Sequence, residues 1–142
     1  MLPFKKIIII DDDKTVNLIC SYIIKKHLPD VLFEAFTNPE EALKSIKQGI
    51  HNAAVTTVIL LDINMPTLTG WEVLEHLRKM LPNFNEHFSV YMFSSSIYYR
   101  DREQSQANPL VTDFIDKPLT IDKLDRIIDA ENSKRTAPTI AT

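Results

Sequence analysis

Acidic side chains cluster at the end of an apolar run near the start of this sequence. Three consecutive aspartates, Asp11–Asp13, follow the isoleucines of KKIIII, and Asp62 follows a second apolar run, VTTVILL. Ser94 follows FSVYMF, and Lys117 lies two residues beyond LVTDFI. Adjacent carboxylates repel one another unless solvent, hydrogen bonds or a cation compensates them. A solvated acidic loop is the simplest interpretation of DDD taken alone.

These residue types also suit one kind of chemistry. Carboxylate oxygens are the ligands that Mg²⁺ prefers, and a carboxylate can attack phosphorus to give an aspartyl phosphate. An ammonium and a hydroxyl can stabilise the phosphoryl oxygens. These residues would therefore support phosphoryl transfer, provided that the fold brings them together.

The pattern of apolar residues predicts a fold that brings these side chains together. Five short apolar runs predict strands at residues 5–10, 31–36, 55–61, 88–93 and 110–115. Amphipathic stretches predict five helices at residues 15–28, 37–49, 71–81, 97–108 and 120–131. Such alternation is typical of a single doubly wound parallel sheet, an α/β fold in which ligands bind at the carboxyl ends of the strands. The aspartates, the serine and the lysine should then meet at one edge, which a solvated loop does not explain.

The sequence also predicts helix ends and buried helix faces. Thr37 and Glu40 have the spacing of a capping box, with Pro39 in the first turn and Gly49 at the end. Apolar stripes on the first and last helices predict two sets of inward side chains: Val16, Ile19, Cys20, Ile23, Ile24 and Leu28, and Ile121, Leu124, Ile127 and Ile128.

Composition bounds the class of protein. The 142 residues are 44% hydrophobic and 25% charged, which fits one globular domain, expected at residues 1–130. Residues 131–142 have no apolar stripe and are predicted to form a disordered C-terminal tail, with no output domain. The single Cys20 excludes an internal disulfide and lies on an apolar helix face, so we expect it in the core.

Charge and hydropathy argue against two kinds of partner. The net charge of −3 and the lack of a basic stretch argue against nucleic acid. No apolar run approaches the roughly 20 residues of a membrane span, and the N-terminus lacks a signal-peptide cleavage site. We therefore expect a cytoplasmic protein that binds neither nucleic acid nor membrane.

Four motifs together resemble a known family. IIIIDDD, LLDINMPTLTG, the serine after the fourth strand and DKP are similar, in order and spacing, to the receiver domain of bacterial response regulators. That domain takes a phosphoryl group from a histidine kinase or a histidine phosphotransfer protein. The resemblance covers residues 5–130 and implies a flavodoxin-like sheet with strand order 2-1-3-4-5. It also implies a single-domain regulator of a phosphorelay, with at most self-phosphorylation and self-dephosphorylation activity.

The resemblance assigns roles to the acidic residues. Asp62 would be the phosphoacceptor, Asp12 a direct Mg²⁺ ligand and Asp11 its water-mediated neighbour. The backbone carbonyl of Asn64 would be a further metal ligand. Asp13 lies beyond the acidic pair of the family and is expected to begin a helix.

The remaining roles concern the phosphoryl group and the signal. Lys117 would pair with the phosphoryl oxygens, and its bond to Pro118 is cis in the family. Ser94 would be the switch hydroxyl, and Ser95–Ser96 loop residues. Phe114 would be the switch aromatic that rotates inward after phosphorylation. Pro66 and Gly70, which complete the loop motif, would shape the loop after Asp62.

Signalling would then occur through a change of surface. The resemblance implies that a downstream protein reads the face formed by the helix at 97–108, the strand at 110–115 and the helix at 120–131. Aromatic contact area would come from Tyr98, Tyr99 and Phe114.

Two alternatives remain at this point. DDDKTV also fits D-x-D-x-T-V of the haloacid-dehalogenase-like phosphatases, with Asp11 as nucleophile and Asp13 as general acid/base. Against it, the chain has no room for a cap and no later acidic pair, and that family does not explain DINMPTLTG. The other alternative is a degenerate receiver that binds partners without being phosphorylated.

Overall fold

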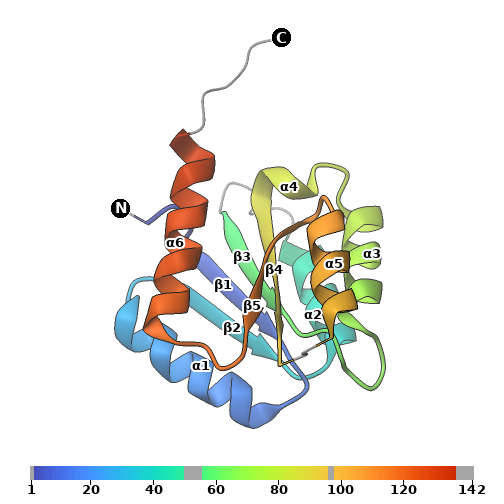
Figure 1. The fold of residues 1–142 in the computed structure, drawn as a ribbon, viewed down its shortest axis with the longest axis horizontal. Coiled ribbons are helices and arrows are strands. Elements are labelled where there is room, and N and C mark those ends of the chain that lie inside the picture. Colours follow the sequence, from blue (N-terminus) through green and yellow to red (C-terminus); the bar gives the residue numbers. More distant parts are fainter. Residues whose placement is uncertain (1, 50–55, 96–97, 137–142) are drawn as a thin grey trace.

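The chain folds around one parallel sheet with helices on both faces (Figure 1). The structure is a computed structural model that describes residues 2–49, 56–95 and 98–136. The strands lie in the order β2-β1-β3-β4-β5, and each neighbouring pair is parallel. This confirms the predicted doubly wound, flavodoxin-like sheet. The strands are β1 Lys6–Ile10, β2 Leu32–Phe36, β3 Thr57–Leu61, β4 Phe88–Ser94 and β5 Val111–Asp116.

The described residues contain six helices, one more than expected. The additional helix, α4, has four residues and precedes β4, where the ring of Phe84 stacks on Phe88 with 5.2 Å between centroids. Residue 55 of the third predicted strand and residue 97 of the fourth predicted helix lie outside the described residues. The helices are α1 Lys14–His27, α2 Pro39–Gln48, α3 Gly70–Met80, α4 Phe84–His87, α5 Tyr99–Ala107 and α6 Ile121–Thr136.

The central strands bury side chains on both faces, which explains their continuous apolar runs. Ile7 and Ile9 pack with residues of α1 and α6, whereas Ile8 and Ile10 pack with residues of α2 and α3. Figure 1 shows these two pairs of helices on opposite faces of the sheet. Cys20 lies in the first of these cores, as predicted, with 1% exposure. Burial, with the nearby charge of Asp11, raises the pKa of the Cys20 thiol to about 12. The thiol therefore stays protonated and packs as a small apolar group.

Two residues predicted to face the core are exposed instead. Ile19 is 47% exposed and Ile121 is 51% exposed. In α1 the buried residues are Asn17, Cys20 and Ile24, and Ile19 lies about 100° around the helix from Cys20. The apolar stripe of the sequence is thus wider than the strip of helix that the sheet covers.

The N-terminal cap of α2 also differs from the prediction. Asn38, not Thr37, caps α2, because its side chain accepts a hydrogen bond from the Glu40 backbone N–H at 2.9 Å. A capping box does occur in α3, where the Thr69 hydroxyl accepts from the Glu72 N–H and the Glu72 carboxylate accepts from the Thr69 N–H. Pro39 in the first turn and Gly49 at the end of α2 lie where predicted.

The last helix continues beyond the predicted start of the tail at residue 131. It ends at Thr136, and Glu131 is only 3% exposed. The Glu131 carboxylate accepts hydrogen bonds from the hydroxyls of Ser89 and Tyr91, both at 2.6 Å, and lies 3.2 Å from the Lys134 ammonium. The two hydrogen bonds attach α6 to β4, so polar contacts hold this part of the helix, where the apolar stripe has ended. Nothing in the described helices is long and apolar enough to cross a membrane.

Replacing Glu131 with alanine should destabilise the fold. Glu131→Ala leaves two buried hydroxyls without their acceptor, and we expect the free energy of unfolding to fall by about 2–3 kcal/mol. Urea denaturation measures this difference. Asp129→Ala, an exposed carboxylate on the same helix, is the control and should change stability by less than about 0.5 kcal/mol. Equal effects from the two variants would contradict the role given to Glu131.

Candidate functional site

Asp11 and Asp62 lie side by side because their strands end in register. Ile10 of β1 pairs with Leu61 of β3. Beyond this pair, the Asp62 N–H donates to the Ile10 carbonyl at 2.9 Å, and the Asp11 N–H donates to the Phe36 carbonyl at 3.0 Å. The hydrogen-bond ladder therefore continues one residue past the strands and fixes both carboxylates at the carboxyl edge of the sheet.

The sequence-predicted acidic residues meet at this edge. One carboxylate oxygen from each of Asp11, Asp12 and Asp62 lies within 4.8 Å of the other two. Asp11 is fully buried and Asp62 is 5% exposed, whereas Asp12 is open to solvent. The Lys117 ammonium lies 2.6 Å from Asp11 Oδ2 and 3.3 Å from Asp62 Oδ1. The ammonium thus pairs with the two buried carboxylates of the three.

This donor set fits a divalent cation. The cluster carries an excess of negative charge after its ion pairs with Lys117 are counted. Hard oxygen ligands, with one carboxylate reachable from solvent, are what Mg²⁺ or a similar ion takes in proteins. The arrangement of Asp11, Asp12 and Asp62 is thus suited to hold such an ion beside Asp62.

The electrostatics of the cluster follow from this crowding. Burial, reinforced by the charge of Asp11, raises the pKa of Asp62 to about 6, although Lys117 opposes the shift. For Lys117, burial alone would lower the pKa, but its hydrogen bond to Asp11 and the charges of Asp62 and Asp11 raise it overall. The ammonium therefore stays charged at neutral pH, and a bound cation would favour the ionised form of Asp62.

Asp13 caps a helix, as the sequence predicted. Its carboxylate accepts from the Thr15 backbone N–H at 2.9 Å at the start of α1. Its own N–H donates to Asp11 Oδ1 at 2.9 Å. Sequence reasoning missed Asn17, whose buried amide donates to the Asp11 carbonyl at 3.0 Å. Asn17 and Asp13 together fix the backbone that carries the acidic pair.

Ser94 and Lys117 lie on neighbouring strand ends. Ser94 is buried at the end of β4, and its carbonyl accepts from the Lys117 N–H at 3.1 Å. The peptide bond between Lys117 and Pro118 is cis, as the resemblance implied. Ser95 is exposed after the strand, and Ser96 lies outside the described residues.

The loop after Asp62 depends on Gly70. A Cβ at this position would lie 2.4 Å from the Asp62 backbone oxygen and 2.9 Å from Met92 Cε. The Gly70 N–H also donates to the Ile63 carbonyl at 2.8 Å, which closes the loop. Asn64 and Pro66 lie within this loop and are exposed. The loop can fold back over β3 only because residue 70 has no side chain.

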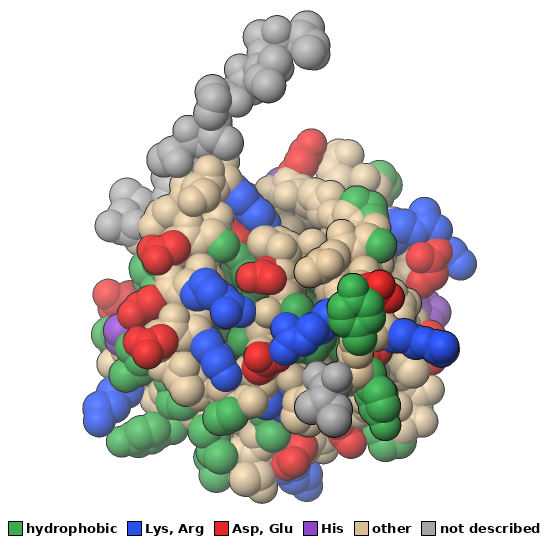
Figure 2. All heavy atoms as spheres, viewed as in Figure 1, with side chains coloured by type: hydrophobic (Ala, Val, Ile, Leu, Met, Phe, Trp, Pro, Cys, Tyr) green, Lys and Arg blue, Asp and Glu red, His purple; other side chains and the backbone are tan. Residues whose placement is uncertain are grey.

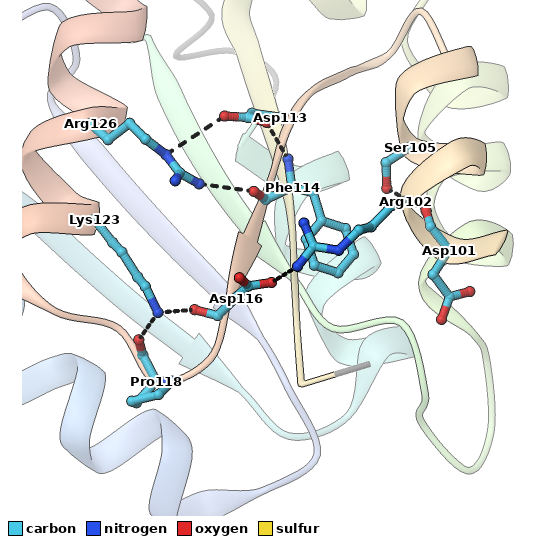
Figure 3. Close-up of polar contacts among 9 residues, drawn as sticks. All are labelled: Asp101, Arg102, Ser105, Asp113, Phe114, Asp116, Pro118, Lys123 and Arg126. Carbon is cyan, nitrogen blue, oxygen red and sulfur yellow. Dashed lines mark hydrogen bonds and ion pairs between the residues drawn. The ribbon is translucent and has the colours of Figure 1, made fainter. Parts of the chain in front are cut away.

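Phe114 lies inward rather than on the surface, so it does not supply the expected aromatic contact area. It is 7% exposed, and the Arg102 guanidinium lies over its ring, 4.7 Å from the centroid (Figure 3). Arg102 also forms an ion pair with Asp116, and Arg126 donates to the Phe114 carbonyl at 3.0 Å. Arg102 thus covers the ring that would otherwise be exposed between α5 and β5.

The fold and the site match a known family. The response regulator receiver domain matches residues 7–129, nearly the whole described chain. The chain belongs to this family. Receiver domains act in two-component signal transduction, and this chain is therefore a protein of that class. Comparison with curated protein sequences finds no match.

Solved structures agree with this assignment. A two-component response regulator from Cytophaga hutchinsonii is 26% identical, with a TM-score of 0.81 over 92% of this chain and 98% of that one. A response regulator receiver protein from Dyadobacter fermentans is 27% identical, with a TM-score of 0.77 over 94% and 98%. The CheX-CheY-BeF3-Mg complex from Borrelia burgdorferi matches with 20% identity and a TM-score of 0.70 over 94% and 90%.

Gly70 should not tolerate even one methyl group. Gly70→Ala places its Cβ against the Asp62 carbonyl, so we expect a loss of about 2–3 kcal/mol in unfolding free energy. Gly49→Ala is the matched control because nothing lies within 4 Å of its Cβ position, and it should leave stability unchanged or raise it by up to about 1 kcal/mol. Thermal and urea denaturation compare them. Similar values for both variants would remove the packing role of Gly70.

The raised pKa of Asp62 predicts how stability depends on pH without metal. A carboxyl whose pKa is higher in the folded state stabilises the fold while protonated, and this contribution is lost as the pH rises from about 4 through about 6. In EDTA, Asp62→Asn should therefore gain stability relative to wild type between pH 4 and pH 7.5, by about 1–3 kcal/mol. Urea denaturation at both pH values measures the change. A difference that does not vary with pH would show that Asp62 ionises normally.

Proposed function

We propose that this receiver accepts a phosphoryl group on Asp62 from a phosphohistidine of a histidine kinase or a histidine phosphotransfer protein. One observation carries the proposal. The Asp62 carboxylate lies within 4.8 Å of oxygens of both Asp11 and Asp12, and 3.3 Å from the Lys117 ammonium. A nucleophile, a cation site and a positive side chain thus meet at one point, as phosphoryl transfer to a carboxylate requires.

Each residue then has a part in the reaction. An Asp62 oxygen forms the new bond to phosphorus while the bond from phosphorus to the donor imidazole breaks. Asp12 would hold Mg²⁺ directly and Asp11 through water, with the Asn64 carbonyl as a further ligand. When bound, Mg²⁺ neutralises charge on the phosphoryl oxygens. The CheX-CheY complex from Borrelia burgdorferi, which contains Mg together with BeF3, supports this choice of ion.

Lys117 and Ser94 would respond to the new group. The Lys117 ammonium, now divided between Asp11 and Asp62, would pair with a phosphoryl oxygen. The Ser94 hydroxyl would turn to hydrogen-bond another and bias a shift between two conformations. Phe114 would transmit this shift through its contact with Arg102.

A downstream protein would read the face formed by α5, β5 and α6. Tyr98 and Tyr99 are 71% and 72% exposed at the start of α5 and offer aromatic contact area. Basic and acidic side chains are interspersed over this side of the molecule (Figure 2). Mixed charge with exposed tyrosines suits a protein partner better than a nucleic acid.

The geometry disfavours the phosphatase alternative. In that interpretation Asp13 would be the general acid/base, but its carboxylate is engaged by backbone N–H groups of α1. Asp11, which would be the nucleophile, is paired with Lys117 at 2.6 Å and is fully buried. Asp62 is less tightly engaged, since it lies 3.3 Å from the Lys117 ammonium and is 5% exposed.

Phosphate labelling tests the proposal directly. With acetyl phosphate or a phosphohistidine donor and Mg²⁺, wild-type protein should gain one phosphoryl group, whereas Asp62→Asn should gain none because a neutral amide replaces the nucleophilic carboxylate. Phos-tag electrophoresis separates the two forms. Asp12→Asn should need at least about tenfold more Mg²⁺ for half-maximal labelling. Asp13→Asn, the matched control, should behave as wild type.

Three other results would contradict the proposal. Equal labelling of wild type and Asp62→Asn would remove Asp62 as the acceptor. Turnover of p-nitrophenyl phosphate that Asp11→Asn abolishes and Asp62→Asn does not would favour the phosphatase. An absence of both labelling and Mg²⁺ affinity would favour a receiver that binds partners without phosphorylation.

A further inference from the structure

The backbone on both sides of Lys117 is held by a second lysine. The Lys123 ammonium in the first turn of α6 donates to the Asp116 carbonyl at 2.9 Å and to the Pro118 carbonyl at 3.0 Å (Figure 3). These two carbonyls belong to the residues directly before and after Lys117. One side chain therefore spans the segment that carries the ammonium of the site.

Lys123 occupies a position that its own helix does not favour. The Lys123 N–H donates to the Thr120 hydroxyl at 3.2 Å, so Thr120 acts as the N-terminal cap and Lys123 is the third residue of the helix. At that position a capping box has Glu or Gln, which bonds back to the cap residue. A positive charge in the first turn also opposes the helix dipole. A lysine that is unfavourable for its own helix indicates a role in contacts outside that helix. The hydrogen bonds of Lys123 to the Asp116 and Pro118 carbonyls are such contacts.

The position of the Lys117 ammonium depends on this segment. Its distances of 2.6 Å to Asp11 and 3.3 Å to Asp62 are set by the backbone at residue 117 and by a flexible four-carbon side chain. The backbone is fixed at one point by the Lys117 N–H, which donates to the Ser94 carbonyl. Arg102 holds the Asp116 carboxylate from α5, and Lys123 holds the adjoining carbonyls from α6. Lys117 thus approaches Asp62 from a segment held by two helices.

We propose that Lys123 is a positioning residue for phosphorylation: by holding the carbonyls of Asp116 and Pro118, it fixes where the Lys117 ammonium lies relative to Asp62. Lys123 does not touch the reacting atoms, and the inference rests on the proposed function of Asp62. Small misplacements of a charge-stabilising group lower reaction rates strongly, so loss of these two contacts should slow labelling more than it weakens Mg²⁺ binding.

Lys123→Gln separates this role from a structural one. Glutamine completes the capping box with Thr120, so the variant should fold at least as stably as wild type. Without the ammonium, labelling of Asp62 by acetyl phosphate should slow about tenfold, while the Mg²⁺ dissociation constant changes less than about twofold. Lys123→Arg, which keeps a long cationic donor, should recover most of the rate. Lys44→Met removes an exposed charge on α2 and is the control for net charge.

A second measurement needs no phosphodonor. Amide hydrogen exchange followed by NMR should show the Lys117 N–H exchanging several-fold faster in Lys123→Gln than in wild type, with little change in the rest of β5. Labelling and Lys117 exchange that both stay at wild-type values would overturn the proposal. Faster exchange with unchanged labelling would reduce Lys123 to a structural contact. If wild-type protein is not labelled at all, the proposed function of Asp62 is wrong, and the positioning role of Lys123 is wrong with it. The exchange result would then show only whether Lys123 stabilises the backbone at Lys117.

Discussion

The structure depends on the placement of three carboxylates at one point, two of which pair with the Lys117 ammonium. Burying Asp11 and Asp62 side by side is unfavourable, since each loses water and each repels the other. Lys117 offsets part of that cost through its contacts at 2.6 Å to Asp11 and 3.3 Å to Asp62. One ammonium does not neutralise all the carboxylates, so the cluster keeps a net negative charge. That residual negative charge is what a divalent cation can neutralise, and a bound cation could then stabilise the oxygens of a phosphoryl group. A site whose negative charge is only partly neutralised by protein groups is suited to bind cations.

Much of the surrounding structure serves to keep that arrangement in place. The ladder of the sheet continues one residue beyond β1 and β3 and thereby aligns the two buried aspartates. Gly70 lets the following loop pass against the Asp62 carbonyl. Lys123 and Arg102 hold the segment that carries Lys117 from two different helices. Rigid supports of this kind matter because electrostatic stabilisation of phosphoryl transfer depends on groups already in position.

The same supports connect the site to the surface that would signal. Arg102 contacts both Asp116, which is next to Lys117, and the ring of Phe114, which lies under α5. A movement of Lys117 toward a phosphoryl group would therefore act on residues already in contact with α5. Only Ser105 of α5 is buried, so this helix has few apolar contacts to resist such a movement. Tyr98 and Tyr99 are exposed at the N-terminal end of α5, where a partner protein could contact the helix and respond to its movement.

The sequence by itself determined the parallel sheet, the edge at which the acidic residues meet and the positions of Asp11, Asp12, Asp62 and Lys117. These follow from local periodicity and from the rule that parallel strands end together, so they need no knowledge of distant contacts. Only the tertiary structure decided that Ile19 is exposed, and that Glu131, Arg102 and Lys123 hold α6 and the Lys117 segment. Each of these depends on how one element lies against another. A glutamate bonded to strand residues about 40 positions away leaves no periodic signal, because its partners are set by packing and not by spacing.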